Sequence, residues 1–131
     1  MPARVLLLES SPELRKVLEE SLGQHGYTVV SATSTEEALD RLCEHAADLV
    51  IADPPAERGE DAGTVERIHE AFPGLPSIVM SRERFDPSVL APASTDVVPR
   101  RVLRKPFRLD ELLVLTRQIL PTNEPPPHAP D

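Results

Sequence analysis

A chain of 131 residues with a formal net charge of −8 has the size of one domain and lacks the clustered cations that broad binding to nucleic acid or anionic membrane requires. Its single cysteine excludes an intrachain disulfide, and no apolar run approaches the roughly 20 residues of a membrane-spanning helix. No signal-peptide pattern is visible, so the sequence predicts a cytoplasmic protein with no direct nucleic-acid partner and no membrane partner.

The chain begins with a predicted strand and helix. Arg4–Leu8 is a continuous apolar run, which is typical of a strand covered on both faces. Ser11 and Pro12 predict a helix start, because a hydroxyl cap is followed by proline at the first helical position. Gly23 and Gly26 end this helix. Its predicted inward stripe is Leu14, Val17, Leu18 and Leu22.

The same alternation continues through the middle of the chain. Tyr27–Ala32 is a predicted second strand, and a capping box of Ser34 and Glu37 starts the next helix. Asp48–Ala52 is a third buried strand, and Thr64–Phe72 is a predicted short helix. The second helix has the predicted inward stripe Ala38, Leu39, Leu42, Cys43 and Ala46.

The last third of the chain is less regular. Ser77–Met80 is a predicted fourth strand, but prolines interrupt Arg82–Pro99, where at most a short or distorted helix near Pro87–Ala91 is expected. Val102–Leu103 indicates a weak fifth strand, and Leu109–Leu120 is a strong final helix. Repeated strand-then-helix units favour a parallel sheet with helices on both faces, an α/β fold.

Two parts are expected in the chain. Residues 1–120 form one domain, whereas Pro121–Asp131 holds five prolines in eleven residues and is predicted to be an extended tail or linker stub.

Polar residues stand where the predicted strands end. Glu9 and Asp53 follow the first and third strands, Ser81 follows the fourth, and Lys105 follows the fifth. Parallel sheets bind ligands beyond these carboxyl ends. A carboxylate can attack phosphorus, Mg²⁺ can bridge it to the phosphoryl oxygens, and a lysine can neutralise the developing charge. A hydroxyl can hydrogen-bond the phosphorylated product.

With these residues in place, the sequence resembles the response regulator receiver family. The motifs are "VLLLESSP", "DLVIAD", "SIVMS" and "KPF" followed by "LDELL", and together they cover Arg4–Leu120. The resemblance implies a flavodoxin-like doubly wound (βα)5 sandwich, with five parallel strands in the order 2-1-3-4-5. The expected fourth helix is irregular, because prolines fill its segment.

The resemblance also implies roles for individual residues. Asp53 matches the phosphoacceptor, and Ser81 and Lys105 match the switch hydroxyl and the lysine that contact the phosphoryl group. Glu9, Asp53 and the backbone carbonyl of Pro55 match the Mg²⁺ ligands.

The sequence departs from the family pattern at four places. Ser10 replaces an expected second acid, and a serine hydroxyl is a poor ligand for Mg²⁺. The loop Pro54–Gly63 carries two prolines and several acids, Arg82–Pro99 replaces a regular helix, and Val102 occupies a position that is often aromatic. We therefore expect a Mg²⁺ site that is weak or absent.

For each of these residues a plainer interpretation remains open. Asp53 could cap a turn, and Ser81 could simply end a strand. Lys105 could be a solvated member of the chain's one local basic run, Arg100, Arg101, Arg104 and Lys105. Glu9 could be an exposed acid near a helix start.

Other chemistry-bearing residues are expected to play no part in a site. His25, His45, His69 and His128 lack metal-ligand spacing and are predicted at the surface, and Cys43 is predicted to pack in the core.

Three functional hypotheses follow. The first is a non-enzymatic receiver-like domain in phosphorelay signal transduction. It takes a phosphoryl group from a histidine kinase or phosphotransfer protein and signals to a downstream protein partner. A homodimer is a further expectation. The second is a phosphorylation-independent pseudo-receiver that acts as a protein-interaction module. The third, a flavodoxin-like cofactor or nucleotide binder, is disfavoured because aromatic residues make up only 3% of the chain and no phosphate-binding loop is visible.

Overall fold

Five parallel strands form a single sheet in the order β2-β1-β3-β4-β5, as predicted. The computed structural model describes residues 3–53, 60–81 and 100–120, and no side chain is described for 60–63 or 81. The strands are β1 (Arg4–Glu9), β2 (Thr28–Ala32), β3 (Leu49–Asp53), β4 (Ser77–Ser81) and β5 (Arg100–Arg104).

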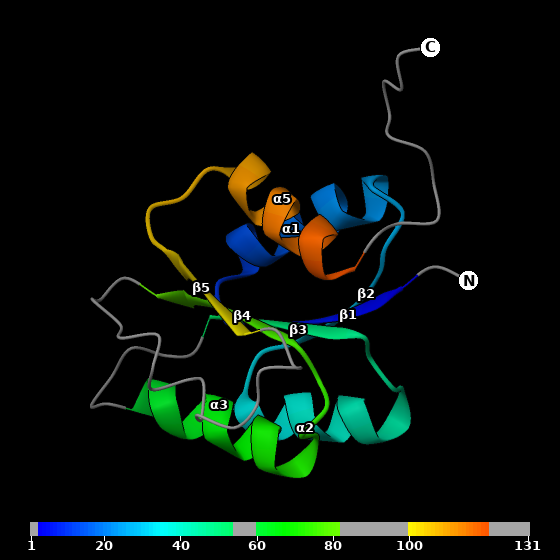
Figure 1. The fold of residues 1–131 in the computed structure, drawn as a ribbon, viewed down its shortest axis with the longest axis vertical. Helices are drawn as coiled ribbons and strands as arrows, with labels where there is room; N and C mark the ends of the chain where they lie inside the picture. Colours follow the sequence, from blue (N-terminus) through cyan, green and yellow to red (C-terminus); the bar gives the residue numbers. More distant parts are fainter. Residues whose placement is uncertain (1–2, 54–59, 82–99, 121–131) are drawn as a thin grey trace.

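Helices cover both faces of this sheet (Figure 1). Helices α1 (Pro12–Gln24) and α5 (Leu109–Ile119) lie on one face, and α2 (Thr35–Glu44) and α3 (Glu60–Ala71) lie on the other. The predicted irregular helix within Arg82–Pro99 falls outside the described residues. The three-layer α/β arrangement expected from the alternating strands and helices is confirmed for the described residues.

The buried strand β1 supplies both halves of the core. Val5 and Leu7 pack toward α1 and α5, whereas Leu6 and Leu8 pack toward α2 and α3, because successive side chains of a strand point to opposite faces. The partners on the helices include Leu18, Leu22 and Leu112 on one side, and Ala38, Leu42 and Ile68 on the other. The unbroken apolar run of the sequence is explained by this two-sided burial.

Helix starts follow the predicted capping chemistry. The Ser11 hydroxyl accepts a hydrogen bond from the Leu14 N–H at 3.4 Å, and the Ser34 hydroxyl accepts one from the Glu37 N–H at 3.1 Å. The second cap places the start of α2 directly after β2, and the first places α1 directly after the end of β1.

Two elements are longer than the sequence pattern indicates. Helix α3 begins at Glu60 rather than Thr64, because a helix tolerates the glycine at position 63 at a cost of about 1 kcal/mol. Strand β5 spans Arg100–Arg104 rather than Val102–Leu103. Its pairing with β4 from Ser77 to Ser81 extends the strand to the flanking arginines, which strand propensity alone does not favour.

Four side-chain predictions are wrong, and one of them is Ala46, which lies beyond the end of α2 and is exposed rather than inward. Val17 was predicted to face inward on α1 but is 49% exposed, and Cys43 on α2 is exposed rather than packed in the core. His69 on α3 was predicted at the surface but is half-buried, with its Nε2 atom 3.1 Å from the Ser77 hydroxyl. Desolvation, followed by the positive charge of Arg100, lowers the pKa of His69 to about 4.

Across the described ranges, no helix combines the length and the apolar character needed to cross a bilayer.

Candidate functional site

Three of the predicted strand-end residues meet at one edge of the sheet. Glu9 ends β1 and Asp53 ends β3, and the two are paired in register on neighbouring strands. Lys105 follows β5, which is separated from β3 by β4. Its side chain nevertheless crosses the end of β4 and reaches Asp53. The carboxyl edge of the sheet therefore brings together two acids and one lysine.

Asp53 and Lys105 form a largely buried ion pair. The Lys105 ammonium donates a hydrogen bond to Oδ2 of Asp53, and the two side chains are only 16% and 15% exposed. Removing one member would leave a charge in a poorly solvated place, which costs more than the pair itself contributes. Lys105 is thus a pocket residue and not a solvated member of the basic run.

Glu9 is the most buried acid of the site, at 1% exposure. Its Oε2 atom accepts a hydrogen bond from the Ser11 N–H at 2.9 Å, whereas no donor among the described residues reaches its Oε1 atom. Desolvation, followed by the hydrogen bond and the negative charge of the neighbouring Asp53, raises the pKa of Glu9 to about 7. The Ser11 N–H and the Lys105 charge oppose this rise.

The two serines after Glu9 differ in their surroundings. Ser10, at the position of the expected second acid, is exposed, and Ser11 is half-buried and caps α1. The turn therefore buries one acid and presents a neutral hydroxyl to solvent. This is the arrangement that the sequence indicated, with Glu9 in the pocket rather than exposed.

The carboxylates fit a hard divalent cation. Glu9 and Asp53 are oxygen donors on neighbouring strand ends, and the buried, unpartnered Oε1 atom of Glu9 is a group that a cation would satisfy. No cluster of three or more acidic, histidine or cysteine side chains with metal-binding geometry exists in the described part of the chain. Two carboxylates alone make a sparse site for Mg²⁺.

Two predicted site residues are not placed by the structure. The backbone of Ser81 ends β4 in register with Arg104, but its side chain is not among those described. Pro55 lies outside the described residues.

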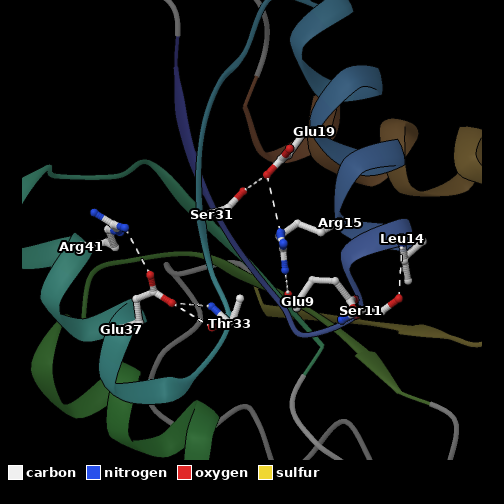
Figure 2. A network of polar contacts seen from close by, with 9 residues as sticks. All are labelled: Glu9, Ser11, Leu14, Arg15, Glu19, Ser31, Thr33, Glu37 and Arg41. Carbon is white, nitrogen blue, oxygen red and sulfur yellow. Dashed lines mark hydrogen bonds and ion pairs between the residues drawn. The ribbon is translucent and has the colours of Figure 1, made fainter.

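Sequence reasoning missed a polar network behind Glu9. Arg15, on the first turns of α1, donates from Nη1 to the main-chain carbonyl of Glu9 at 3.2 Å, and its Nε atom lies 3.9 Å from Glu19. Glu19 in turn accepts a hydrogen bond from the Ser31 hydroxyl on β2 (Figure 2). The only sequence signal was an Arg–Glu spacing of four residues on a helix, which is too common to single out.

An open pocket of about 520 Å³ adjoins the ion pair. It is lined by Leu14, Lys105, Pro106 and Phe107, so an apolar surface borders the buried charges. A second pocket, of about 550 Å³, is lined by the ends of α2 and α3 and by Leu120. None of the predicted site residues lines that second pocket.

The sequence matches a known protein family and several curated relatives. Residues 5–117 match the response regulator receiver domain family. The response regulator MprA of Mycobacterium sp. (strain KMS) is 30% identical over 126 residues, which are 95% of this chain and 54% of that protein. The transcriptional regulatory protein GlrR of Escherichia coli (strain K12) is 32% identical over 111 residues, 85% of this chain and 24% of that protein. The chain thus spans about half the length, or less, of these curated relatives.

Solved structures support the fold. A two-component response regulator from Clostridium difficile superposes with a TM-score of 0.76 at 19% identity, covering 90% of this chain and 95% of that chain. The chemotaxis protein CheY4 of Vibrio cholerae superposes with a TM-score of 0.72 at 23% identity, covering 92% and 100%. With nearly the whole sequence matched, the strand order shared and the acidic edge in place, this chain belongs to the receiver domain family of two-component response regulators.

Proposed function

We propose that Asp53 accepts a phosphoryl group from a phosphohistidine. The observation that carries this proposal is the buried Asp53–Lys105 ion pair beside Glu9. Lys105 donates a hydrogen bond to Oδ2, and Oδ1 is the proposed oxygen that attacks phosphorus. The new P–O bond forms as the P–N bond of the donor breaks, and the electron pair returns to the imidazole nitrogen. Lys105 is placed to neutralise negative charge on the transferred group.

A weakly bound Mg²⁺ ion completes this proposed site. Glu9 and Asp53 would hold it through their side-chain oxygens, and the carbonyl of Pro55, a residue outside the described ranges, would be its main-chain ligand. When bound, the ion neutralises charge on the phosphoryl oxygens. The exposed hydroxyl of Ser10 adds no charge, so the affinity is expected to be low.

The proposed partners are a histidine kinase or phosphotransfer protein and a downstream protein. The pocket beside Lys105, with Leu14 and Phe107 at its walls, offers the donor an apolar surface next to the acceptor. Ser81 and Lys105 are proposed to respond to the phosphoryl group and to alter a surface that the downstream partner recognises. Homodimer formation and a cytoplasmic location stay predictions, as does the absence of enzymatic activity.

Residues 1–120 are proposed to act as the receiver unit, with residues 121–131 as a tail or linker. The match to the family ends at residue 117, which supports this division.

Intact-mass spectrometry after incubation with acetyl phosphate and Mg²⁺ tests the proposal. We expect one phosphoryl group to be added to the wild type and none to Asp53→Asn, with beryllofluoride shifting the NMR signals of residues around Asp53. An unmodified wild type, with no spectral change at millimolar Mg²⁺, would refute phosphoryl transfer to Asp53.

A phosphorylation-independent interaction module is the second candidate. Two observations favour it: Ser10 is exposed and neutral, and the Asp53–Lys105 pair is already satisfied without a ligand. Under this alternative the wild type and Asp53→Asn bind the downstream partner equally well. A loss of biological output in Asp53→Ala, with output retained in Asp53→Glu, contradicts it.

A further inference from the structure

The end of β1 is contacted by Arg15 of α1, which is not one of the residues gathered at the carboxyl edge of the sheet. The register of β1 with β2 stops at Leu8 opposite Ala32, so β2 provides no register partner for Glu9. The side chain of Arg15 folds back from α1 and donates to the Glu9 carbonyl at 3.2 Å. Figure 2 shows the guanidinium lying between α1 and the strand end.

Arg15 is itself held in place. Its Nε atom lies 3.9 Å from Oε2 of Glu19, and that oxygen also accepts a hydrogen bond from Ser31. The Arg15 side chain is 25% exposed and that of Glu19 is 38% exposed, so the pair is only partly screened by solvent. A continuous path of polar contacts therefore joins β2, α1 and the end of β1.

The position of the Glu9 carboxylate depends on this turn. Among the described residues, its hydrogen bond to a fixed donor comes from the Ser11 N–H at 2.9 Å, two residues further along the same turn. The Arg15 contact restrains the carbonyl of Glu9, and the Ser11 contact restrains the carboxylate. A metal ligand is most effective when a neighbouring hydrogen-bonded group fixes its orientation.

We propose that Arg15 is a positioning residue that, with Glu19 and Ser31, holds Glu9 in the geometry that binds Mg²⁺ beside Asp53. This inference rests on the proposed function of the Asp53 pocket. With one acid missing at position 10, the site depends more heavily on the orientation of the acid that remains.

The chain contains a matched control on α2. Arg41 pairs with Glu37 at 3.2 Å across one helical turn, and Glu37 accepts hydrogen bonds from the backbone N–H and hydroxyl of Thr33 at 2.9 Å. This arrangement copies the Arg15–Glu19–Ser31 network but has no bond to Glu9 or Asp53 (Figure 2). Arg41→Ala therefore removes the equivalent Arg41–Glu37 pair, and with it the Arg41–Glu44 pair at 3.8 Å, without touching the site.

Mg²⁺ titration of amide NMR signals measures the effect. We expect Arg15→Ala to weaken Mg²⁺ binding about 10-fold, as removal of groups behind a metal ligand commonly does, and Glu19→Gln to weaken it less. Arg15→Lys keeps the charge but cannot bridge Glu9 and Glu19 as the guanidinium fork does, so an intermediate loss is expected. Arg41→Ala should bind like the wild type.

Hydrogen exchange of the Ser11 amide, recorded without metal, gives a second readout. Its exchange should quicken about 10-fold in Arg15→Ala and stay unchanged in Arg41→Ala, because the Arg15 side chain, unlike that of Arg41, contacts the turn that holds the Glu9–Ser11 hydrogen bond. The exchange measurement separates the two proposals, because it is made without metal. A wild type that binds no Mg²⁺ in the titration refutes the metal site, and Ser11 exchange still decides the role of Arg15. Unchanged Ser11 exchange in Arg15→Ala, or equal losses of Mg²⁺ affinity in Arg15→Ala and Arg41→Ala, overturns the inference.

Discussion

At the end of β1, a buried acid stands next to an exposed hydroxyl. Glu9 is 1% exposed and its pKa is raised to about 7, whereas Ser10 faces solvent. A carboxyl group in this condition is partly protonated near neutral pH and becomes a good ligand only when a cation offsets its desolvation. The chemistry of the site therefore depends on Glu9, whose negative charge is only weakly stabilised by the surrounding protein.

Restoring the second acid should strengthen cation binding. Ser10→Asp adds a carboxylate beside Glu9 and Asp53, and a further charge a few ångströms from a divalent ion is worth at least about a tenfold gain in affinity. The comparison is a Mg²⁺ titration of both proteins by NMR or calorimetry. Ser10→Asn, which has a similar shape without the charge, is the control. Equal affinities for wild type and Ser10→Asp would show that position 10 does not contact the ion.

The ion pair should be costly to break from one side. Lys105→Ala leaves Asp53 charged in a pocket where it is only 15% exposed, so we expect a loss of about 2 kcal/mol in the free energy of unfolding. Adding Asp53→Ala to this variant removes the stranded charge and should recover about 1 kcal/mol. Urea unfolding at neutral pH measures both variants. A double variant less stable than Lys105→Ala would be inconsistent with a stranded charge.

At the scale of elements, the site exists because the strand ends are aligned. Parallel pairing places Glu9 opposite Asp53, and β4 carries β5 to the position from which Lys105 reaches back. Helix α1 adds the Ser11 cap and the Arg15 contact directly behind this edge. The site is therefore assembled by the sheet and restrained by the first helix.

Helix α5 packs on one face of the sheet, and Leu112 is its most deeply buried apolar residue. Leu112 is fully buried, whereas Val114 two positions away is 53% exposed. Leu112→Ala should lower the free energy of unfolding by about 2–5 kcal/mol because it leaves a cavity in the core, and Val114→Ala should change it by less than about 0.5 kcal/mol. Thermal and urea unfolding of the two variants compare them directly. A similar loss in both would mean that α5 is not anchored through Leu112.

At the scale of the whole molecule, the buried Glu9 and the half-buried His69 give opposite pH dependences. The pKa of Glu9 is about 7 in the folded state against an ordinary 4.5, so between these values the folded state holds more protons and stability falls as pH rises. The pKa of His69 is about 4 against an ordinary 6.5, so between these values the unfolded state holds more protons and stability rises with pH. The two effects oppose each other from pH 4.5 to 6.5.

Single substitutions should separate these contributions. Relative to wild type, Glu9→Gln should gain stability as pH rises from 4.5 to 7, because the cost of ionising the buried acid is gone. His69→Gln should gain relative stability as pH falls from 6.5 toward 4, because the unfolded state no longer gains a proton there. Each change should be on the order of 1–2 kcal/mol after solvent screening. Urea unfolding across this range in EDTA measures it, and differences that do not vary with pH would contradict the assignment.

The sequence by itself determined the local elements and the residues at their ends. Apolar runs such as Leu49–Ala52 indicate buried strands, and the Ser11 and Ser34 caps mark helix starts, because these signals depend on neighbours a few residues apart. Family motifs then supplied the sheet order that the structure shows.

The family resemblance predicted that Asp53 and Lys105 lie in one site, but only the tertiary structure decided the individual contacts. Lys105 contacts Asp53 across 52 positions, and Arg15 supports Glu9 from a helix whose spacing pattern was ordinary. The exposures of Val17 and Cys43 were missed for the same reason, since a helical stripe reports which face is apolar but not how far the neighbouring elements cover it. Contacts of this kind depend on strand register and side-chain reach, which arise from long-range packing and leave no local mark in the sequence.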